Sequence, residues 1–300
     1  MPSTIGLIAS FATLAALAWL LALARRGMRR TTLQTAWWWM AGVCALWGMT
    51  AAVVLSDRSS PEIQSQSLYW TAIAALCPGV AILGAKRPGS RVWNLFIVVP
   101  LVLVLGWPAV TVWRADGPRL FTAEWPVLGG LLLVLVMGTG NYLGTRFAGA
   151  AALYSAAIVL LVAPASVAMT RSRADLAGVT RWMFLAATGL LAAAGWLAWR
   201  ASRAWPADRT TGTARLWNDF RETFGIVWGT RLRERLLHEA AREKWPGNAI
   251  PGIEGLEFAE GATAEDRQQA EARYRHHLLW LLRRFVDPAW IEERLGERVE

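Results

Sequence analysis

The three histidines are the residues whose types could do chemistry, and all of them lie in the last quarter of the chain. His238 precedes Glu239, an order that resembles a phospho-acceptor histidine, but the chain has no ATP-binding motif to supply a phosphate. His276 and His277 could bind a phosphate or a metal ion, yet adjacent residues on a helix point about 100° apart. We therefore predict no catalytic, cofactor-binding or metal site. An enzyme with a site at the cytosolic membrane surface, built from His238, His276 and nearby carboxylates, is the third-ranked hypothesis.

A second group of candidates consists of prolines and uncharged polar residues within the hydrophobic part of the chain. The segments 77–79 and 106–108 combine proline and glycine as in broken membrane helices, and polar side chains near them could line a cavity. The candidate lining residues are Pro78, Asn94, Pro108, Asn141 and Tyr142. Helix kinking and hydrogen bonding between helices is the favoured interpretation of the same residues. The apolar runs hold no acidic or basic residue, which argues against an ion-coupled pump. Cys44 and Cys77 have no metal-binding spacing and imply no disulfide framework.

Membrane helices must position these residues, because hydrophobic runs of about 20 residues fill the first 200 positions. We place seven runs, at about 4–24, 33–55, 68–85, 92–113, 125–145, 147–169 and 182–199. The stretch 125–169 is nearly continuous and is divided at 144–149, where Arg146 interrupts it; two spans or an irregular re-entrant pair both stay open. Four arginines follow the first run instead of preceding it, so we expect a retained helix and not a signal peptide. The predicted fold is all-α, a polytopic membrane helix bundle of seven transmembrane helices over residues 1–200.

The distribution of charge orients this bundle and excludes nucleic acid as a partner. Residues 1–200 carry 15 Lys+Arg against 5 Asp+Glu, whereas residues 201–300 carry 16 against 17. The net charge of +9 therefore belongs to the membrane loops, where 12 basic residues flank one side and 6 the other. The positive-inside rule then predicts an N-terminus outside and a C-terminus in the cytoplasm. Arginine far outnumbers lysine, which favours a bacterial origin and hence the bacterial inner membrane.

Residues after the last run change character and predict a soluble helical domain. We expect a linker at 201–214 and a cytosolic amphipathic helical domain at 215–300. Six apolar residues within about 120° on one helix form the predicted interaction face: Leu216, Trp217, Phe220, Phe224, Val227 and Trp228. The apolar face changes between Gly225 and Gly229, which indicates either that the helix breaks or kinks there or that its two halves meet different neighbours. Residues 249–262 hold a small hairpin at most, Thr263 and Asp266 resemble a capping box, and Asp287-Pro288 begins a last helix that ends at Gly296.

Exposing two tryptophans and two phenylalanines would be costly, so the interaction face must be covered. We expect it to pack on the second cytosolic helix, 264–286, so that both form one compact unit near the membrane. For function, the sequence favours a non-catalytic, membrane-anchored interaction, scaffold or sensory module. A permease or channel for a neutral or apolar solute is the alternative. The expected partners are the lipid bilayer and a protein at the cytosolic domain, with no cofactor and no nucleic acid; oligomerisation stays open.

Overall fold

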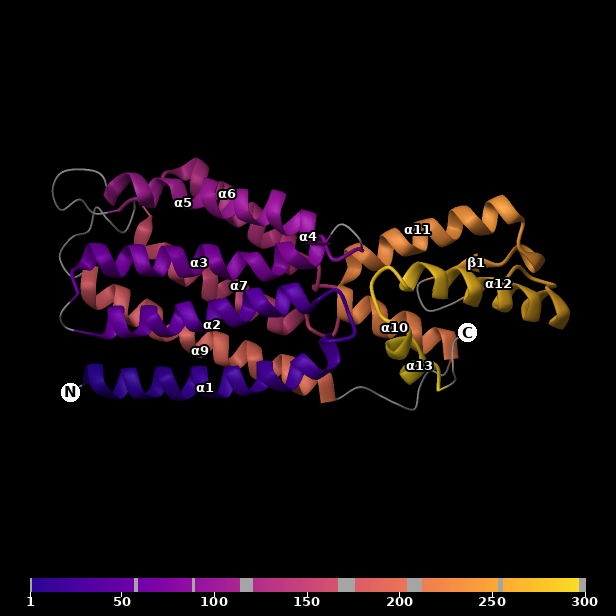
Figure 1. Cartoon of the computed structure of the whole chain (residues 1–300), viewed down its shortest axis with the longest axis horizontal. Coiled ribbons are helices and arrows are strands. Elements are labelled where there is room, and N and C mark those ends of the chain that lie inside the picture. Colours follow the sequence, from indigo (N-terminus) through magenta and orange to yellow (C-terminus); the bar gives the residue numbers. More distant parts are fainter. Residues whose placement is uncertain are drawn as a thin grey trace.

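The structure is a computed structural model in which helices make up almost all of the described chain (Figure 1). A bundle of long helices lies side by side along the longest axis, and a group of shorter helices is packed against one end of it. We call this second group the C-terminal region, residues 212–296. The described residues are 2–56, 59–87, 90–113, 121–166, 176–203, 212–252 and 256–296.

The bundle is built from helices that match the seven predicted hydrophobic runs. Their bounds are α1 Pro2–Met28, α2 Gln34–Leu55, α3 Pro61–Leu83, α4 Ser90–Trp93, η1 Asn94–Val98, α5 Val99–Trp113, α6 Trp125–Gly140, α7 Ala148–Val162, η2 Ala163–Ala165 and α9 Leu176–Arg203. Five helices are long and apolar enough to cross a membrane: Thr4–Met28, Gln34–Leu55, Pro61–Leu83, Ala148–Ala165 and Ala177–Arg203. The fourth and fifth predicted spans form shorter apolar helices, Asn94–Val110 and Trp125–Gly140. The stretch 125–169 is divided as predicted, with a turn between α6 and α7.

The fourth run is helical from Ser90 to Trp113 but contains a π-helical turn, η1, that the sequence analysis missed. Within it the Val99 N–H donates to the carbonyl of Asn94, five residues back. Pro100 follows at once, and a proline ring clashes with the carbonyl four residues before it in an α-helix. A wider turn next to the proline lets the helix continue without a sharp kink.

Helix α3 is the centre of the bundle. Of its apolar window 67% is buried, against 33% or less for the other four candidate spans. Its Gly79 lies against Gly138 of α6, where an added Cβ would be 3.0 Å from the Gly138 Cα. Pro78 sits inside α3, and the Tyr154 hydroxyl of α7 donates to the nearby Ala75 carbonyl at 2.8 Å. The prolines and tyrosine in this part of the chain therefore serve helix packing.

The C-terminal region consists of short amphipathic helices and a minimal hairpin. Its elements are α10 Gly212–Phe224, α11 Ile226–Glu243, η4 Pro246–Asn248, β1 Ile250–Pro251, β2 Leu256–Glu257, α12 Ala264–Leu282 and α13 Pro288–Leu295. The capping box is confirmed, since the Thr263 side chain accepts from the Asp266 N–H and the Asp266 carboxylate accepts from the Thr263 N–H. The last helix is also confirmed, with Pro288 in its first turn and Gly296 in the left-handed conformation after its end. The predicted linker lies mostly outside the described residues.

The predicted change of face is confirmed as a helix break at Gly225. Helix α10 ends at Phe224 and α11 begins at Ile226. Gly225 has φ +86°, a backbone conformation that costs a residue with a side chain far more than glycine. The break lets two helices with different apolar faces meet different neighbours.

Candidate functional site

The loops at one end of the bundle form a continuous junction with the C-terminal region. Three loops take part: residues 29–33 between α1 and α2, residues 84–87 before α4, and residues 141–147 between α6 and α7. They lie at the end of the bundle that faces α10, α11 and α13 (Figure 1). This junction is the candidate functional site, because it brings together segments that are distant in sequence.

Asn141 holds the break between α10 and α11. Its Nδ2 donates to the Phe224 carbonyl at 2.9 Å, and its Oδ1 accepts from the Val227 N–H at 2.9 Å. Its own carbonyl accepts from the Ile226 N–H at 2.8 Å. The first N–H groups of a helix have no partner within the helix, so Asn141 caps α11 from another element. Gly225 is required here, since a Cβ on it would lie 2.2 Å from Asn141 Nδ2.

The rest of the α6–α7 turn contacts α10. The Tyr142 hydroxyl donates to the Thr223 carbonyl at 3.1 Å, and the Arg146 N–H donates to the Glu222 carboxylate at 2.8 Å. Glu222 is only 8% exposed although it is charged. Its second oxygen lies 3.6 Å from the guanidinium of Arg221. The α6–α7 turn, predicted as a boundary between spans with Asn141 and Tyr142 as candidate cavity-lining residues, is therefore a binding surface for α10.

The other two loops pair with the segment that joins α12 to α13. The Thr32 N–H donates to the Phe285 carbonyl, the Asp287 N–H donates to the Arg30 carbonyl and the Arg87 N–H donates to the Arg284 carbonyl, each at 2.8 Å. Arg87 also forms an ion pair with the Asp287 carboxylate. The backbone of 284–287 is thereby fixed by two loops of the bundle at once.

An aromatic cluster fills the space above these loops. The rings of Phe220, Phe224 and Trp228 surround Phe285 with centroid distances of 5.2, 5.5 and 4.8 Å. The Trp228 indole N–H donates to the carbonyl of Ile82, at the end of α3. Leu33 and Ala85 from the bundle loops are buried in the same hydrophobic cluster. Two loop residues of the bundle thus complete the hydrophobic core of the C-terminal region.

The predicted interaction face is therefore used within the chain. Leu216, Trp217, Phe220, Phe224 and Trp228 are buried and Val227 is half-buried. Three rings of this face contact Phe285, which lies within the predicted range 264–286 but after the end of α12 at Leu282. This face is therefore not free to bind another protein.

Asp219, on the other side of α10, is also buried, which the sequence analysis did not foresee. Its carboxylate lies 2.8 Å from the Arg294 guanidinium of α13. Burial raises the pKa of Asp219, and the positive charges of Arg294, Arg215 and Arg146 oppose this rise. Burial likewise lowers the pKa of Arg294. The pair is thus a buried ion pair in which burial and electrostatic attraction act on both pKa values in opposite directions.

The predicted cavity-lining residues have different partners in the structure. Asn141 and Tyr142 bond to α10 as described, and Asn94 accepts from the Trp39 indole N–H at 2.9 Å in the bundle. Pro78 is buried in α3 next to its close approach to α6, and Pro108 lies inside α5. For Asn141 and Tyr142 the favoured interpretation, hydrogen bonding between helices, describes what the structure shows.

The histidines do not gather into a centre in the described part of the chain. His277 contacts the Glu243 carboxylate at 3.0 Å and stacks on Trp245, while His238 is exposed on α11. This hydrogen bond to His277 lowers the pKa of Glu243. Among the described residues no three His, Cys, Asp or Glu side chains lie together as metal ligands would.

Comparison with protein-family models, with curated proteins and with solved structures finds no match for this chain. Its function has to be inferred from the junction and the surfaces around it.

Proposed function

We propose that this membrane protein is a non-catalytic interaction or sensory module, which holds its C-terminal region in a fixed position and presents the outer surface of that region to a cytosolic protein. The junction supports this proposal, because three loops of the bundle form hydrogen bonds with the backbone of the C-terminal region. A simple tether needs no such contacts. A movement of α3 or α6 would move the bound helices, because their loops are bonded to residues 224–227 and 284–287.

The surface available to a partner is the charged outer face of α11 and α12. Gln268 and Glu271 lie three apart on α12 and are exposed, as are Glu234 and Arg235 on α11. A polar surface of this kind fits a partner that binds and leaves, since non-obligate interfaces are about as polar as the rest of a protein surface.

Affinity purification of the full chain in mild detergent tests this proposal. We expect a stoichiometric cytosolic partner, and we expect its recovery to fall several-fold in the variant Gln268→Lys with Glu271→Lys. The control is Glu124→Lys, an exposed carboxylate at the start of α6, at the opposite end of the bundle. Recovery of no partner from cells that express the protein, or equal loss in the control, would contradict the proposal.

We also propose that the bundle crosses the bacterial inner membrane seven times, with the C-terminal region in the cytoplasm. The helical run from Ser90 to Trp113 is about 36 Å long at 1.5 Å per residue, enough for a hydrocarbon core of about 30 Å. The ends of α1 and α9 that carry Arg25, Arg26, Arg200 and Arg203 lie at the same end of the bundle (Figure 1), as the positive-inside rule requires. Helix α6 has 16 residues and needs local thinning of the bilayer.

Reporter fusions test this topology. Fusions after Ser59 and Ala115 are expected to report the periplasm, and fusions after Gly89 and Ala207 the cytoplasm. A periplasmic signal after Ala207 would refute the count of seven spans.

A second candidate function is a permease for a neutral or apolar solute. The π-helical turn η1 favours it, because such turns often mark functional sites within helices. Purified protein in liposomes would then take up such a solute without a partner, and replacing Pro100 with Ala, which removes the cause of the π-helical turn, would change the rate. No uptake by the wild-type protein for any neutral solute offered would count against this candidate.

A further inference from the structure

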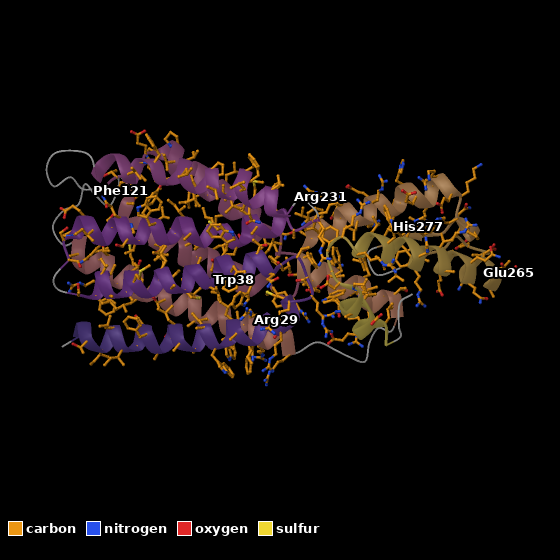
Figure 2. All side chains as sticks on the ribbon, viewed as in Figure 1. Arg29, Trp38, Phe121, Arg231, Glu265 and His277 are labelled. Atoms are coloured by element: carbon orange, nitrogen blue, oxygen red, sulfur yellow. The ribbon has the colours of Figure 1, made fainter. Side chains whose placement is uncertain are left out.

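The bundle and the C-terminal region enclose a basic cleft on the side of α1. It has a volume of about 470 Å³ and lies between the end of α1 and helix α13. Its charged lining consists of Arg26, Arg29, Arg30, Glu293 and Arg294, and Trp290 forms part of its wall. Arg29 is labelled at this end of the bundle in Figure 2. Four arginines against one glutamate make the cleft a site for an anion.

The arginines of the cleft are available to a ligand to different degrees. Within the described residues, Arg26 and Arg29 form no ion pair, and both are exposed. Arg30 pairs with Glu293 at 3.3 Å, but both side chains are more than half exposed, so a ligand can displace this pair at little cost. Arg294 is held in place by Asp219 and stacks on Trp290, with its Cζ 3.7 Å from the ring centroid. The cleft thus combines one rigid guanidinium with three adaptable ones.

The cleft lies beside a tryptophan belt. Arg25, adjacent to Arg26 in α1, has its Cζ 4.8 Å from the Trp37 ring and 5.4 Å from the Trp38 ring. Trp38 is 55% exposed on the outside of the bundle. Tryptophans at the end of a membrane helix mark the depth of the lipid headgroups. The cleft therefore opens next to the headgroups of the surrounding leaflet.

We propose that this cleft binds the phosphate of an anionic phospholipid. The planar guanidinium forks of several arginines match phosphate oxygens, and basic pockets on the cytoplasmic side of membrane helices recognise such headgroups. A cleft of this size is within the range of about 300–1,000 Å³ that holds small ligands. The lipid would join α1 to α13 and reinforce the junction. The inference rests on the proposed orientation of α1, which the reporter fusions test separately.

Native mass spectrometry of the full chain in mild detergent, with lipid titrated in, tests the proposal. The probes are phosphatidylglycerol, phosphatidylcholine with the same acyl chains, and inorganic phosphate. We expect phosphatidylglycerol to bind preferentially, and Arg26→Gln with Arg29→Gln to weaken it roughly 30-fold, at about fivefold for each basic residue near a membrane surface. The control is Lys86→Gln with Arg231→Gln, which removes two exposed charges elsewhere at the junction. In Figure 2 Arg231 is labelled on the other side of the junction from Arg29. Because salt screens charges that lie far from the bound lipid, we expect the control variant to bind phosphatidylglycerol at most about threefold more weakly than the wild type does.

A second variant is expected to increase the affinity for phosphatidylglycerol, a result that a folding defect cannot produce. Glu293→Gln removes the negative charge of the cleft and frees Arg30, and we expect it to tighten phosphatidylglycerol binding about fivefold. Equal binding by the wild type and by Arg26→Gln with Arg29→Gln would overturn the proposal, as would an equal loss in the control. Binding of inorganic phosphate with no preference for phosphatidylglycerol over phosphatidylcholine would assign the cleft to a soluble phosphate ligand and overturn the lipid assignment.

Discussion

Replacing Asn141 with Ala tests whether one side chain holds the C-terminal region on the bundle. Asn141 is 1% exposed, and its amide bonds to the Phe224 carbonyl and the Val227 N–H. The substitution leaves both groups without this partner in a largely buried place, at a cost of about 1–3 kcal/mol for each. The sum lies between about 2 and 6 kcal/mol, and we expect about 3 kcal/mol, because the Val227 N–H is only partly buried and can reach water.

Hydrogen exchange in detergent measures this loss where it occurs. A local destabilisation of about 3 kcal/mol makes the Val227 amide exchange roughly 100-fold faster, since about 1.4 kcal/mol corresponds to a factor of ten. Amides in the middle of α12 serve as the internal reference, because their bonds do not involve Asn141. An unchanged exchange rate at Val227, or an equal increase throughout the protein, would refute the reasoning.

The contact with Gly225 allows an independent check by a double-mutant cycle. Gly225→Ala in the wild type suffers both a clash with the Asn141 amide and the strain of an alanine at φ +86°. In the Asn141→Ala background the clash is gone, and only the strain of placing alanine in a backbone conformation that is essentially restricted to glycine remains, about 1–3 kcal/mol. The second substitution is therefore expected to cost less in that background. Additivity within about 0.5 kcal/mol would show that the two residues do not interact.

The remaining predictions concern packing and pH. Gly138→Ala pushes α6 away from the backbone of α3 and is expected to cost about 1–3 kcal/mol in thermal unfolding, whereas Gly140→Ala, which meets open space, serves as the unaffected control. Phe285→Ala removes the centre of the aromatic cluster and is expected to cost about 3–5 kcal/mol, while Phe96→Ala on the exposed surface of the bundle costs little; equal effects would contradict the assigned core. The raised pKa of Asp219 means that its contribution to stability is fully present below the unfolded pKa of about 3.9 and is lost as pH rises through the folded value. We therefore expect the melting temperature of the wild type to fall relative to that of Asp219→Asn as pH rises above 4. A difference between the two proteins that does not change with pH would contradict the raised pKa of Asp219.

The elements that depend on local sequence could be predicted. Apolar runs of about 20 residues form helices because a helix makes all its backbone hydrogen bonds within the same segment. This holds for apolar side chains that are buried in the bundle and for those that are exposed on its outside. The capping box at Thr263 and the stop at Gly296 each depend on a few adjacent residues. The break at Gly225 could be predicted because the apolar face changes there, even though the reason for the break lies in another element.

The candidate site could not be predicted, because its partners are distant in sequence. Asp219 and Glu222 lie outside the apolar arc of α10, yet both are buried because they face α13 and the α6–α7 turn. Amphipathic patterning describes a helix with one buried face. A helix enclosed between a bundle and another helix has several buried faces, and its charged residues are then placed by single partners such as Arg294. Asn141 and Tyr142 carried the same ambiguity, since an amide at the end of a membrane helix can line a cavity or cap a helix from another element.

Backbone groups also fix the position of the C-terminal region, beside the side chains. In the described part of the chain, four backbone hydrogen bonds join the bundle loops to this region, through the N–H groups of Thr32, Arg87, Ile226 and Asp287. Every residue except proline carries these groups, so no choice of side chain marks them in the sequence. A shift by one residue would leave several of them unpaired at once, at about 1–3 kcal/mol for each group that is buried. The loops therefore hold the C-terminal region in one register.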